Sequence, residues 1–369
     1  MDESEMYLRE CISACEEIIA SGIYSLTDNA ADRKTQYRDM FTNADACGVY
    51  TNEFIWARDY DLALNVTYAI NNYMVNPQHA NYAFTRQFIN TYLMLDGTPF
   101  TEKYEDFNSV DFNTECKDRD YRLAQTIRTP GFTRDNGATF WAPDVKFSKT
   151  GYQPIKWLTD DSTKDTNVSA IASDVPLIRY AEVLLAYAEA KAELNEMTEE
   201  IWNRTIKPLR ERAGVKSIYP SEADPYMVEY FQNRITDPYI LEVRRERGIE
   251  LTMENSRFDD IIRWHQGELF ARPWMGIWIE AVDTPLDLNS DNVPETIVSA
   301  DGSLTSTLNI LPIDGASEAG HKLSEGTRGN ILPSTALQRN WHDYKYLKPI
   351  PTTAIQENPN LTQNPGWEK

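Results

Sequence analysis

Charged residues stand within the most regular apolar helical pattern of this chain. Residues 174–196 read DVPLIRYAEVLLAYAEAKAELNE, and their apolar positions recur at the spacing of an amphipathic helix, with Pro176 suited to its first turn. Arg179, Glu182 and Glu189 lie among these apolar positions. Because a buried charge is costly unless it is paired, this helix requires charged partners from elsewhere in the chain.

A second charged helical stretch, residues 244–264, offers such partners. Opposite charges there often stand three or four positions apart, so Arg247 can reach Glu250. Two interpretations compete: carboxylates acting as general acid and base, or ion pairs that fix helix against helix and helix against the C-terminal tail. We favour the structural one, because neighbouring guanidinium groups keep a carboxylate ionised. The predicted structural ion-pair residues are Arg179, Glu182, Glu189, Glu246, Glu250 and Arg257.

Further helices and one strand are predicted around these stretches. The strand is expected in residues 52–60, NEFIWARDY. Successive helix pairs with small residues at their crossings are typical of tetratricopeptide units, so the predicted fold class is mainly α, a tetratricopeptide-like helical repeat scaffold. The expected helices cover residues 7–19 with a stop at Gly22, 199–214 with a kink at Pro208, 237–255 from an Asp237–Pro238 N-cap, and 256–266.

Two long segments lack sustained periodicity and are predicted to be large irregular loop excursions. Loops of this length inside a compact protein tend to be functional. The proline-rich C-terminal tail forbids long regular structure, so side-chain docking must hold it. We expect a single domain over 1–369, with a helical-array part at about 1–60, a loop-rich excursion at 61–169, helical units at 170–266 and a loop-rich C-terminal part at 267–369.

Composition and motifs narrow the function classes. The net charge of −21 argues against nucleic acid or an anionic membrane surface as a partner. Nucleotide-binding, zinc-protease and nucleophile-elbow motifs are missing, so we predict no catalytic residue, no metal and no cofactor. A glycoside hydrolase stays open as an alternative, because carboxylates distant in sequence can meet in space. The four cysteines are expected to be buried or free thiols, and the four histidines, His79, His265, His321 and His342, to be surface or loop residues.

One acidic loop resembles the start of a calcium-binding loop. Asp287, Asn289, Asp291 and Glu295 stand at alternating positions. The pattern lacks the glycine and the distal glutamate that such a loop needs. Asx turns in an exposed loop explain it better.

Aromatic residues are the strongest indication of a ligand. Sugar rings stack their C–H faces on Trp and Tyr while nearby polar groups bind the hydroxyls, so a glycan site is an aromatic-rich irregular surface. Trp141, between turn signals in DNGATFWAPD, is the first candidate, whereas Trp264 and Trp341 are assigned to packing. The predicted ligand-binding residues are Trp141, Tyr104, Phe140, Trp274 and Trp278.

Three phrases resemble successive signatures of the SusD/RagB family. They are PLIRYAEVLLAYAEAKAELNE, ERGIELTMENSRFDDIIRW and the most specific, YLKPIPTTAIQENPNLTQNPGW. Weaker matches, such as RDYRLAQTI and EFIWARDY, extend the resemblance over nearly the whole chain.

The resemblance implies a non-catalytic, glycan-binding outer-membrane lipoprotein of Bacteroidetes. Such a protein captures an extracellular oligosaccharide on the outward-facing surface and delivers it to a TonB-dependent, SusC-like barrel. The lipoprotein signal, the lipid-bearing Cys and the earlier tetratricopeptide units of that family precede the part seen here, so we expect an N-terminally incomplete member whose membrane anchor is not in this chain. Capture of a non-sugar nutrient such as a peptide, or a scaffold role for protein partners, remain alternatives.

Overall fold

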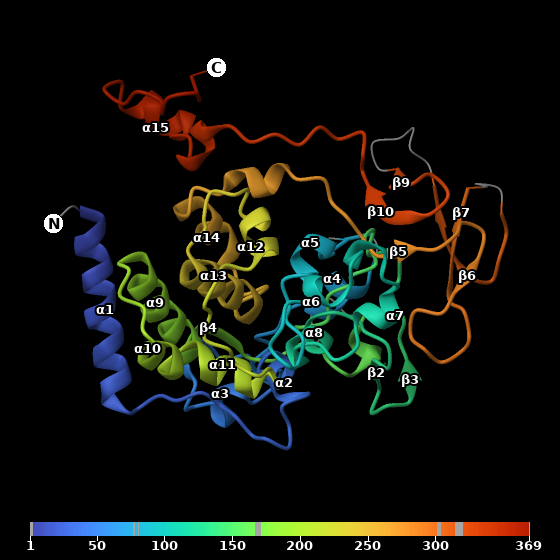
Figure 1. The fold of residues 1–369 in the computed structure, drawn as a ribbon, viewed down its shortest axis with the longest axis horizontal. Coiled ribbons are helices and arrows are strands. Elements are labelled where there is room, and N and C mark those ends of the chain that lie inside the picture. Colours follow the sequence, from blue (N-terminus) through green and yellow to red (C-terminus); the bar gives the residue numbers. More distant parts are fainter. Residues whose placement is uncertain are drawn as a thin grey trace.

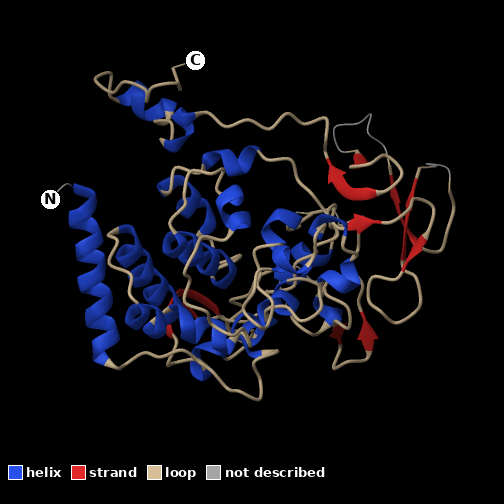
Figure 2. Cartoon of the chain, in the orientation of Figure 1, coloured by secondary structure: helices blue, strands red, loops and turns tan. Residues whose placement is uncertain are grey.

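The computed structural model describes residues 3–76, 78–79, 81–166, 171–300, 304–313 and 320–368. Most long helices gather at one end of the molecule and most of the short strands at the other, with a loop-rich region between them (Figure 2). In the described part of the chain, no helix is both long and apolar enough to span a membrane.

The helical end confirms the mainly α prediction. The first helix packs along the central one, which packs in turn on the next long helix (Figure 1). The apolar faces meet around small residues such as Ala181, Ala188 and Ala192, which let the helix axes approach closely. These helices are α1 (Glu3–Ser21), α9 (Tyr180–Glu193), α10 (Glu199–Arg204), α11 (Ile206–Arg212), α12 (Pro225–Tyr230), α13 (Pro238–Glu250) and α14 (Arg257–Arg263).

The predicted start of the central helix is wrong. Residues Val175–Arg179 form a strand, β4, and α9 begins only at Tyr180. β4 pairs antiparallel with β1 (Phe54–Arg58), which confirms the predicted strand at residues 52–60. The Asp174 carboxylate accepts hydrogen bonds from the main chain of Cys47 and Tyr60, so tertiary pairing overrides the helical pattern of this segment.

Two other helices have boundaries that differ from the predicted ones. The helix predicted with a kink at Pro208 breaks into α10 and α11 at Thr205, because the proline ring cannot pack against the preceding turn. The helix predicted from Asp237 does begin there, with the Asp237 carboxylate accepting from the amides of Tyr239 and Ile240. It ends at Glu250 rather than at residue 255.

The middle of the chain is mainly irregular, as predicted for its loop-rich excursion. Its short elements pack on two apolar clusters, one around Tyr92 and Tyr152 and one around Phe41 and Trp157. Two of these elements, α2 (Gln36–Thr42) and α3 (Ala46–Val49), precede the predicted excursion. Those within it are α4 (Ile70–Val75), α5 (Arg86–Ile89), α6 (Phe100–Lys103), η1 (Phe107–Ser109), α7 (Phe112–Glu115), α8 (Tyr121–Thr126), β2 (Thr133–Arg134), β3 (Thr139–Phe140) and η2 (Ser162–Lys164).

The loop-rich C-terminal part contains small sheets that sequence analysis did not foresee. One has the order β5-β10-β9 and the other β6-β7-β8, with β7 and β8 parallel. His321 is buried in β9, so its assignment to the surface or a loop is wrong. The elements are η3 (Gly267–Ala271), β5 (Trp278–Ile279), β6 (Pro285–Leu286), β7 (Thr296–Ser299), β8 (Asn309–Pro312), β9 (His321–Leu323) and β10 (Gly329–Pro333).

A buried ion-pair network joins the helical end to the loop-rich middle. The Glu250 carboxylate at the end of α13 pairs with Arg122 of α8 at 2.8 Å, with Arg179 of β4 at 3.0 Å and with Arg212 of α11. Glu53, just before β1, pairs with the last two at 2.8 Å each. These side chains are almost fully buried, which confirms the structural interpretation of the charges in the helices.

Individual pairings differ from the prediction. Arg247 reaches Asp260 at 2.8 Å and Glu182 at 3.8 Å instead of Glu250, because α14 folds back beside α13. Arg257 donates to the Tyr230 hydroxyl at 3.1 Å and has no carboxylate partner among the described residues. Glu189 binds Arg263 and the Trp264 indole, the latter at 2.6 Å.

The C-terminal tail is docked by aromatic rings rather than by the predicted ion pairs. It crosses from the strands back over α14 toward the end of the molecule where the N-terminus lies (Figure 1), and carries η4 (Asp343–Tyr346) and α15 (Thr352–Glu357). The Tyr346 ring contacts His265 in a tilted arrangement, and its hydroxyl accepts from the Gly267 amide at 2.9 Å. Trp341 covers Gly267 so closely that any side chain there would collide with the indole. In the described ranges, no ion pair links this tail to the helices.

Replacing Glu250 with Gln should destabilise the fold by about 3–5 kcal/mol, because it leaves three buried guanidinium groups without their shared anion. Urea denaturation of both proteins measures this loss. Glu325→Gln is the matched control, since Glu325 pairs with Arg328 in solvent. Equal stability of the Glu250 variant and the wild type would contradict the role given to the network.

Burial, with a smaller contribution from Lys149, lowers the pKa of His321 to about 4 from its ordinary 6.5. Between about pH 4 and pH 6.5, His321 is therefore protonated in the unfolded chain and neutral in the folded chain. Stability should fall as the pH drops from about 6.5 to 4, by roughly 2 kcal/mol after allowance for solvent screening. Denaturation midpoints of wild type and His321→Leu across this range measure the effect, and parallel pH profiles would contradict it.

Candidate ligand-binding cleft

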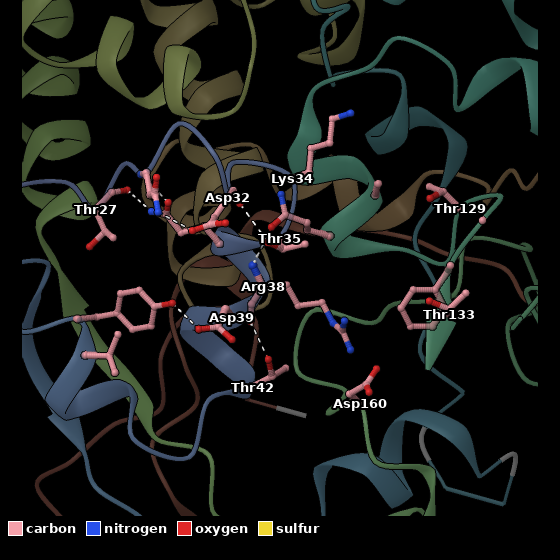
Figure 3. A pocket seen from close by; sticks show the side chains of 18 of the residues that line it. Thr27, Asp32, Lys34, Thr35, Arg38, Asp39, Thr42, Thr129, Thr133 and Asp160 are labelled. Atoms are coloured by element: carbon pink, nitrogen blue, oxygen red, sulfur yellow. Dashed lines mark hydrogen bonds between the residues drawn. The ribbon is translucent and has the colours of Figure 1, made fainter. Parts of the chain in front are cut away.

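A cleft of about 770 Å³ opens between α2 and the segment that follows α8. One wall comes from the loop after α1 and from α2, with Thr27, Asp32 and Arg38; the facing wall comes from Thr129 to Thr133 (Figure 3). Asp160 lies at the edge between the two walls. These groups lie far apart in the sequence, and the fold alone brings them together.

The packing of α2 determines which of its side chains face the cleft. Tyr37, Met40 and Phe41 lie on its buried face. The Tyr37 hydroxyl donates to the Glu250 carbonyl at 2.6 Å and accepts from Lys156 Nζ at 2.7 Å. The helix is thereby joined to the ion-pair network, and its opposite face is held toward the cleft.

Two buried amides hold the wall in place. Gln36 donates to the Thr27 carbonyl at 2.5 Å and accepts from the Asn29 amide at 2.7 Å. Gln125 of α8 accepts from the Arg38 amide at 3.0 Å and donates to the Arg33 carbonyl at 3.1 Å. The loop after α1 is therefore bonded to α2, and α2 to α8, so the cleft has a prearranged shape.

The cleft contains both cationic and anionic side chains. The Arg38 guanidinium donates to the carbonyls of Ile155, at 3.1 Å, and Leu158, and lies 5.3 Å from the centre of the Phe132 ring. Burial lowers the pKa of Arg38 to about 10, so it stays protonated at neutral pH. The Asp39 carboxylate accepts from the Tyr50 hydroxyl.

The hairpin of β2 and β3 adds aromatic surface beside the cleft. Its Arg134 is fully buried and donates to both Asp165 oxygens, at 2.6 and 2.8 Å, and to the Thr159 carbonyl. The Trp141 amide donates to the carbonyl of Phe132, a lining residue, at 3.0 Å. The hairpin is therefore held by the bonds of Arg134 to Asp165 and Thr159, and it is connected to the cleft wall through Trp141.

Trp141 and Phe140 differ in exposure on this hairpin, because Trp141 is half-buried and Phe140 is exposed. The Trp141 ring lies 4.8 Å from the Arg134 guanidinium and 5.0 Å from that of Arg128, and its indole N–H is buried without a partner in the described structure. Phe140 is 56% exposed. None of the five predicted ligand-binding residues lines the cleft itself. Phe140 pairs with Thr133 and Trp141 is bonded to Phe132, so these two lie next to lining residues.

The other three predicted residues lie in separate surroundings. Tyr104 contacts the Phe100 ring at 5.5 Å. Trp274 is 43% exposed, and the Arg339 guanidinium lies 4.0 Å from its ring centre. Trp278 is only 8% exposed in β5, so it offers little surface to a ligand.

Sequence reasoning missed the polar residues of the cleft. Arg38, Asp39 and Asp160 belong to no motif, and nothing in their local sequence distinguishes them from other exposed charges. The sequence offers one indication of this cleft: Phe132 is an aromatic residue among turn-forming residues in the phrase PGFTRDNG.

The acidic loop predicted to consist of Asx turns does so. The Asp287 carboxylate accepts from the amides of Asn289, Ser290 and Asn292, at 3.1, 2.6 and 2.8 Å. One carboxylate oxygen from each of Asp287, Asp291 and Glu295 lies within 4.8 Å of the other two.

Comparison with known proteins finds relatives of one family. A sequence model described as the SusD family matches residues 52–367. SusD-like protein P38 of Formosa agariphila is 27% identical over 299 residues, which cover 76% of this chain and 54% of that protein. This chain thus spans about half the length of that relative.

Solved structures show the same fold. A SusD-like protein from Bacteroides fragilis NCTC 9343 has a TM-score of 0.64 at 22% identity, covering 99% of this chain and 62% of that one. A SusD-like carbohydrate binding protein from the same strain has a TM-score of 0.61 at 22% identity, covering 97% and 62%. The helical scaffold is therefore shared, and this chain accounts for less than two thirds of each structure.

Replacing Arg134 with Lys should loosen the hairpin, because an ammonium group cannot bind Asp165 and Thr159 through a planar fork. Hydrogen exchange of the Trp141 amide, which depends on the hairpin's position against Phe132, should accelerate roughly tenfold or more. Arg328→Lys, on an exposed pair, is the control. Unchanged exchange at Trp141 would show that something else holds the hairpin.

Proposed function

Since the chain belongs to the SusD family, we propose that it binds an oligosaccharide at the cell surface and leaves it chemically unchanged. The observation that carries this proposal is the cleft itself, a polar hollow with an aromatic hairpin at its side. Its volume suits a small-molecule site, which typically measures about 300–1,000 Å³.

The composition of the cleft matches the chemistry of sugars. Hydroxyl groups of a sugar donate and accept hydrogen bonds at once, and Thr133, Asp39 and Arg38 supply acceptors and donors around one hollow. Phe140, exposed on the adjoining hairpin, supplies a flat surface for the C–H face of a sugar ring. A longer oligosaccharide can therefore extend from the cleft onto the hairpin.

The charges of the frame favour binding over hydrolysis. Burial alone would raise the pKa of Glu250, but Arg212, Arg179 and Arg122 hold it below its usual range. A carboxyl group held in this way cannot donate a proton at neutral pH. In the cleft, one Asp39 oxygen accepts from the Tyr50 hydroxyl and from the Asn43 side-chain amide, the latter at 3.0 Å, and the other oxygen remains for a ligand hydroxyl. We therefore propose a binding protein and keep the glycoside hydrolase as the alternative to test.

Cellular placement and partner follow from the family resemblance as part of the same proposal. The protein would lie on the outward face of the outer membrane, held there by a lipid anchor. It would pass the oligosaccharide to a TonB-dependent, SusC-like barrel. Co-purification of the tagged protein with such a barrel from outer membranes tests the partnership, and its absence from stringently washed complexes would count against it.

Calorimetric titration with a panel of neutral oligosaccharides, together with an assay for new reducing ends, tests binding against hydrolysis. We expect binding without release of reducing ends. Phe140→Ala and Trp141→Ala should each weaken it about five- to tenfold through lost stacking. Trp274→Ala, on a separate surface, should leave affinity unchanged.

Other results would redirect the proposal. Loss of binding in the Trp274 variant alone would move the site to that surface. Release of reducing ends would favour the hydrolase. Binding of peptides in place of sugars would favour capture of a non-sugar nutrient.

A further inference from the structure

Arg38 and Asp160 lie near each other at the edge of the cleft without forming an ion pair. Figure 3 shows the guanidinium group of Arg38 pointing toward the Asp160 carboxylate. The two groups, both in the described part of the chain, form no ion pair with each other. Asp160 and Asp39 act on Arg38 through space, but no carboxylate of the described residues forms an ion pair with it. The buried Arg122, Arg134 and Arg179 each bind a carboxylate directly.

Both groups are fixed in place by the protein and keep further bonding capacity. Arg38 uses its Nε and one terminal nitrogen on the carbonyls of Ile155 and Leu158, which leaves other N–H groups of the fork for the cleft. One Asp160 oxygen accepts from the Asn136 amide at 2.7 Å, and the second has no partner in the described ranges. A donor and an acceptor are thus held apart at the same hollow.

We propose that neighbouring hydroxyls of a neutral sugar bridge Arg38 and Asp160, so that the cleft selects uncharged sugars over uronic acids and sulfated sugars. This inference rests on the proposed function of oligosaccharide binding. A hydroxyl oxygen accepts from the guanidinium, and a hydroxyl hydrogen is donated to the carboxylate. Each bond has one charged partner and is stronger than a bond between neutral groups.

The charges around the bridge explain the selection. A carboxylate or sulfate on the sugar could pair with Arg38, but it would lie beside the Asp160 oxygen that needs a proton donor. Asp32 and Asp39 line the same hollow, against Lys34 and Arg38 as its cations. The whole chain carries a net charge of −21, which repels an anionic oligosaccharide before it arrives. The Asp160 carboxylate therefore acts mainly by repelling anionic sugars, and less by attracting neutral ones.

Matched ligands isolate the effect of charge. The probes are cellotetraose, maltotetraose, mannotetraose and galactotetraose, each compared with the same compound oxidised at C6 to the uronic acid. By titration calorimetry, wild type should bind at least one neutral probe about tenfold or more tightly than its oxidised counterpart.

Asp160→Asn is the decisive variant, because Asp160 is exposed and its replacement threatens no core packing. The variant removes the anion but keeps a hydrogen-bond acceptor. We expect the preference for the neutral probe to fall to about threefold or less. Asp161→Asn is the matched control: it makes the same charge change at the next residue, which does not line the cleft and whose carboxylate accepts from Thr163. The control should retain the wild-type preference.

The outcomes separate this inference from the proposal beneath it. If the oxidised probe binds as tightly as the neutral one, or if Asp160→Asn and Asp161→Asn behave alike, the selection by Arg38 and Asp160 is wrong while sugar binding stands. If no probe of either kind binds, the proposed function and this inference fail together.

Discussion

Three buried guanidinium groups share one carboxylate at Glu250, and the arrangement of the fold follows from this requirement. Arg122 comes from α8, Arg179 from the end of β4 and Arg212 from the end of α11. Moving any of these elements away would leave a charge buried without a partner, which costs more than the pairing gains. The network therefore specifies how the helical end sits against the loop-rich middle, and apolar packing supplies the stability.

The same ion-pair network also positions one wall of the cleft. Helix α2 forms one wall of the cleft, and its Tyr37 is hydrogen-bonded to Glu250 of the network. The network therefore also fixes the position of the face of α2 that lines the cleft. The buried Arg122, Arg179 and Arg212 bind carboxylates, whereas Arg38 binds main-chain carbonyls and a ring face. The buried Arg119 is bonded in the same way, but Arg38 differs from it because it lines the cleft with part of its guanidinium group free.

Local patterns predicted what depends on local physics. The helical periodicity, the Asp237 cap and the need to pair Arg179 and Glu189 can all be recognised within a few turns of sequence. Residues 175–179 could not be recognised as a strand, because their conformation depends on pairing with residues more than a hundred positions earlier. Strands of two to five residues in the C-terminal part carry too few alternations to stand out from loops.

None of the residues that line the cleft was predicted as ligand-binding, and the predicted rings stay a prediction. Trp141 and Phe140 stand out as large rings between turn formers, and the structure places them on one hairpin beside the cleft. Trp278 shows the same kind of sequence signal but lies in a sheet. Arg38 and Asp160 meet only through tertiary folding, so no spacing rule connects them.

Two buried glutamines bond the cleft wall to main-chain groups on three sides, and this has a thermodynamic consequence for recognition. A wall already immobilised loses little conformational freedom when a ligand binds, so the entropic cost of association falls mainly on the ligand. If the proposed oligosaccharide binding holds, stiff glycans, which have little flexibility to lose, would bind most favourably.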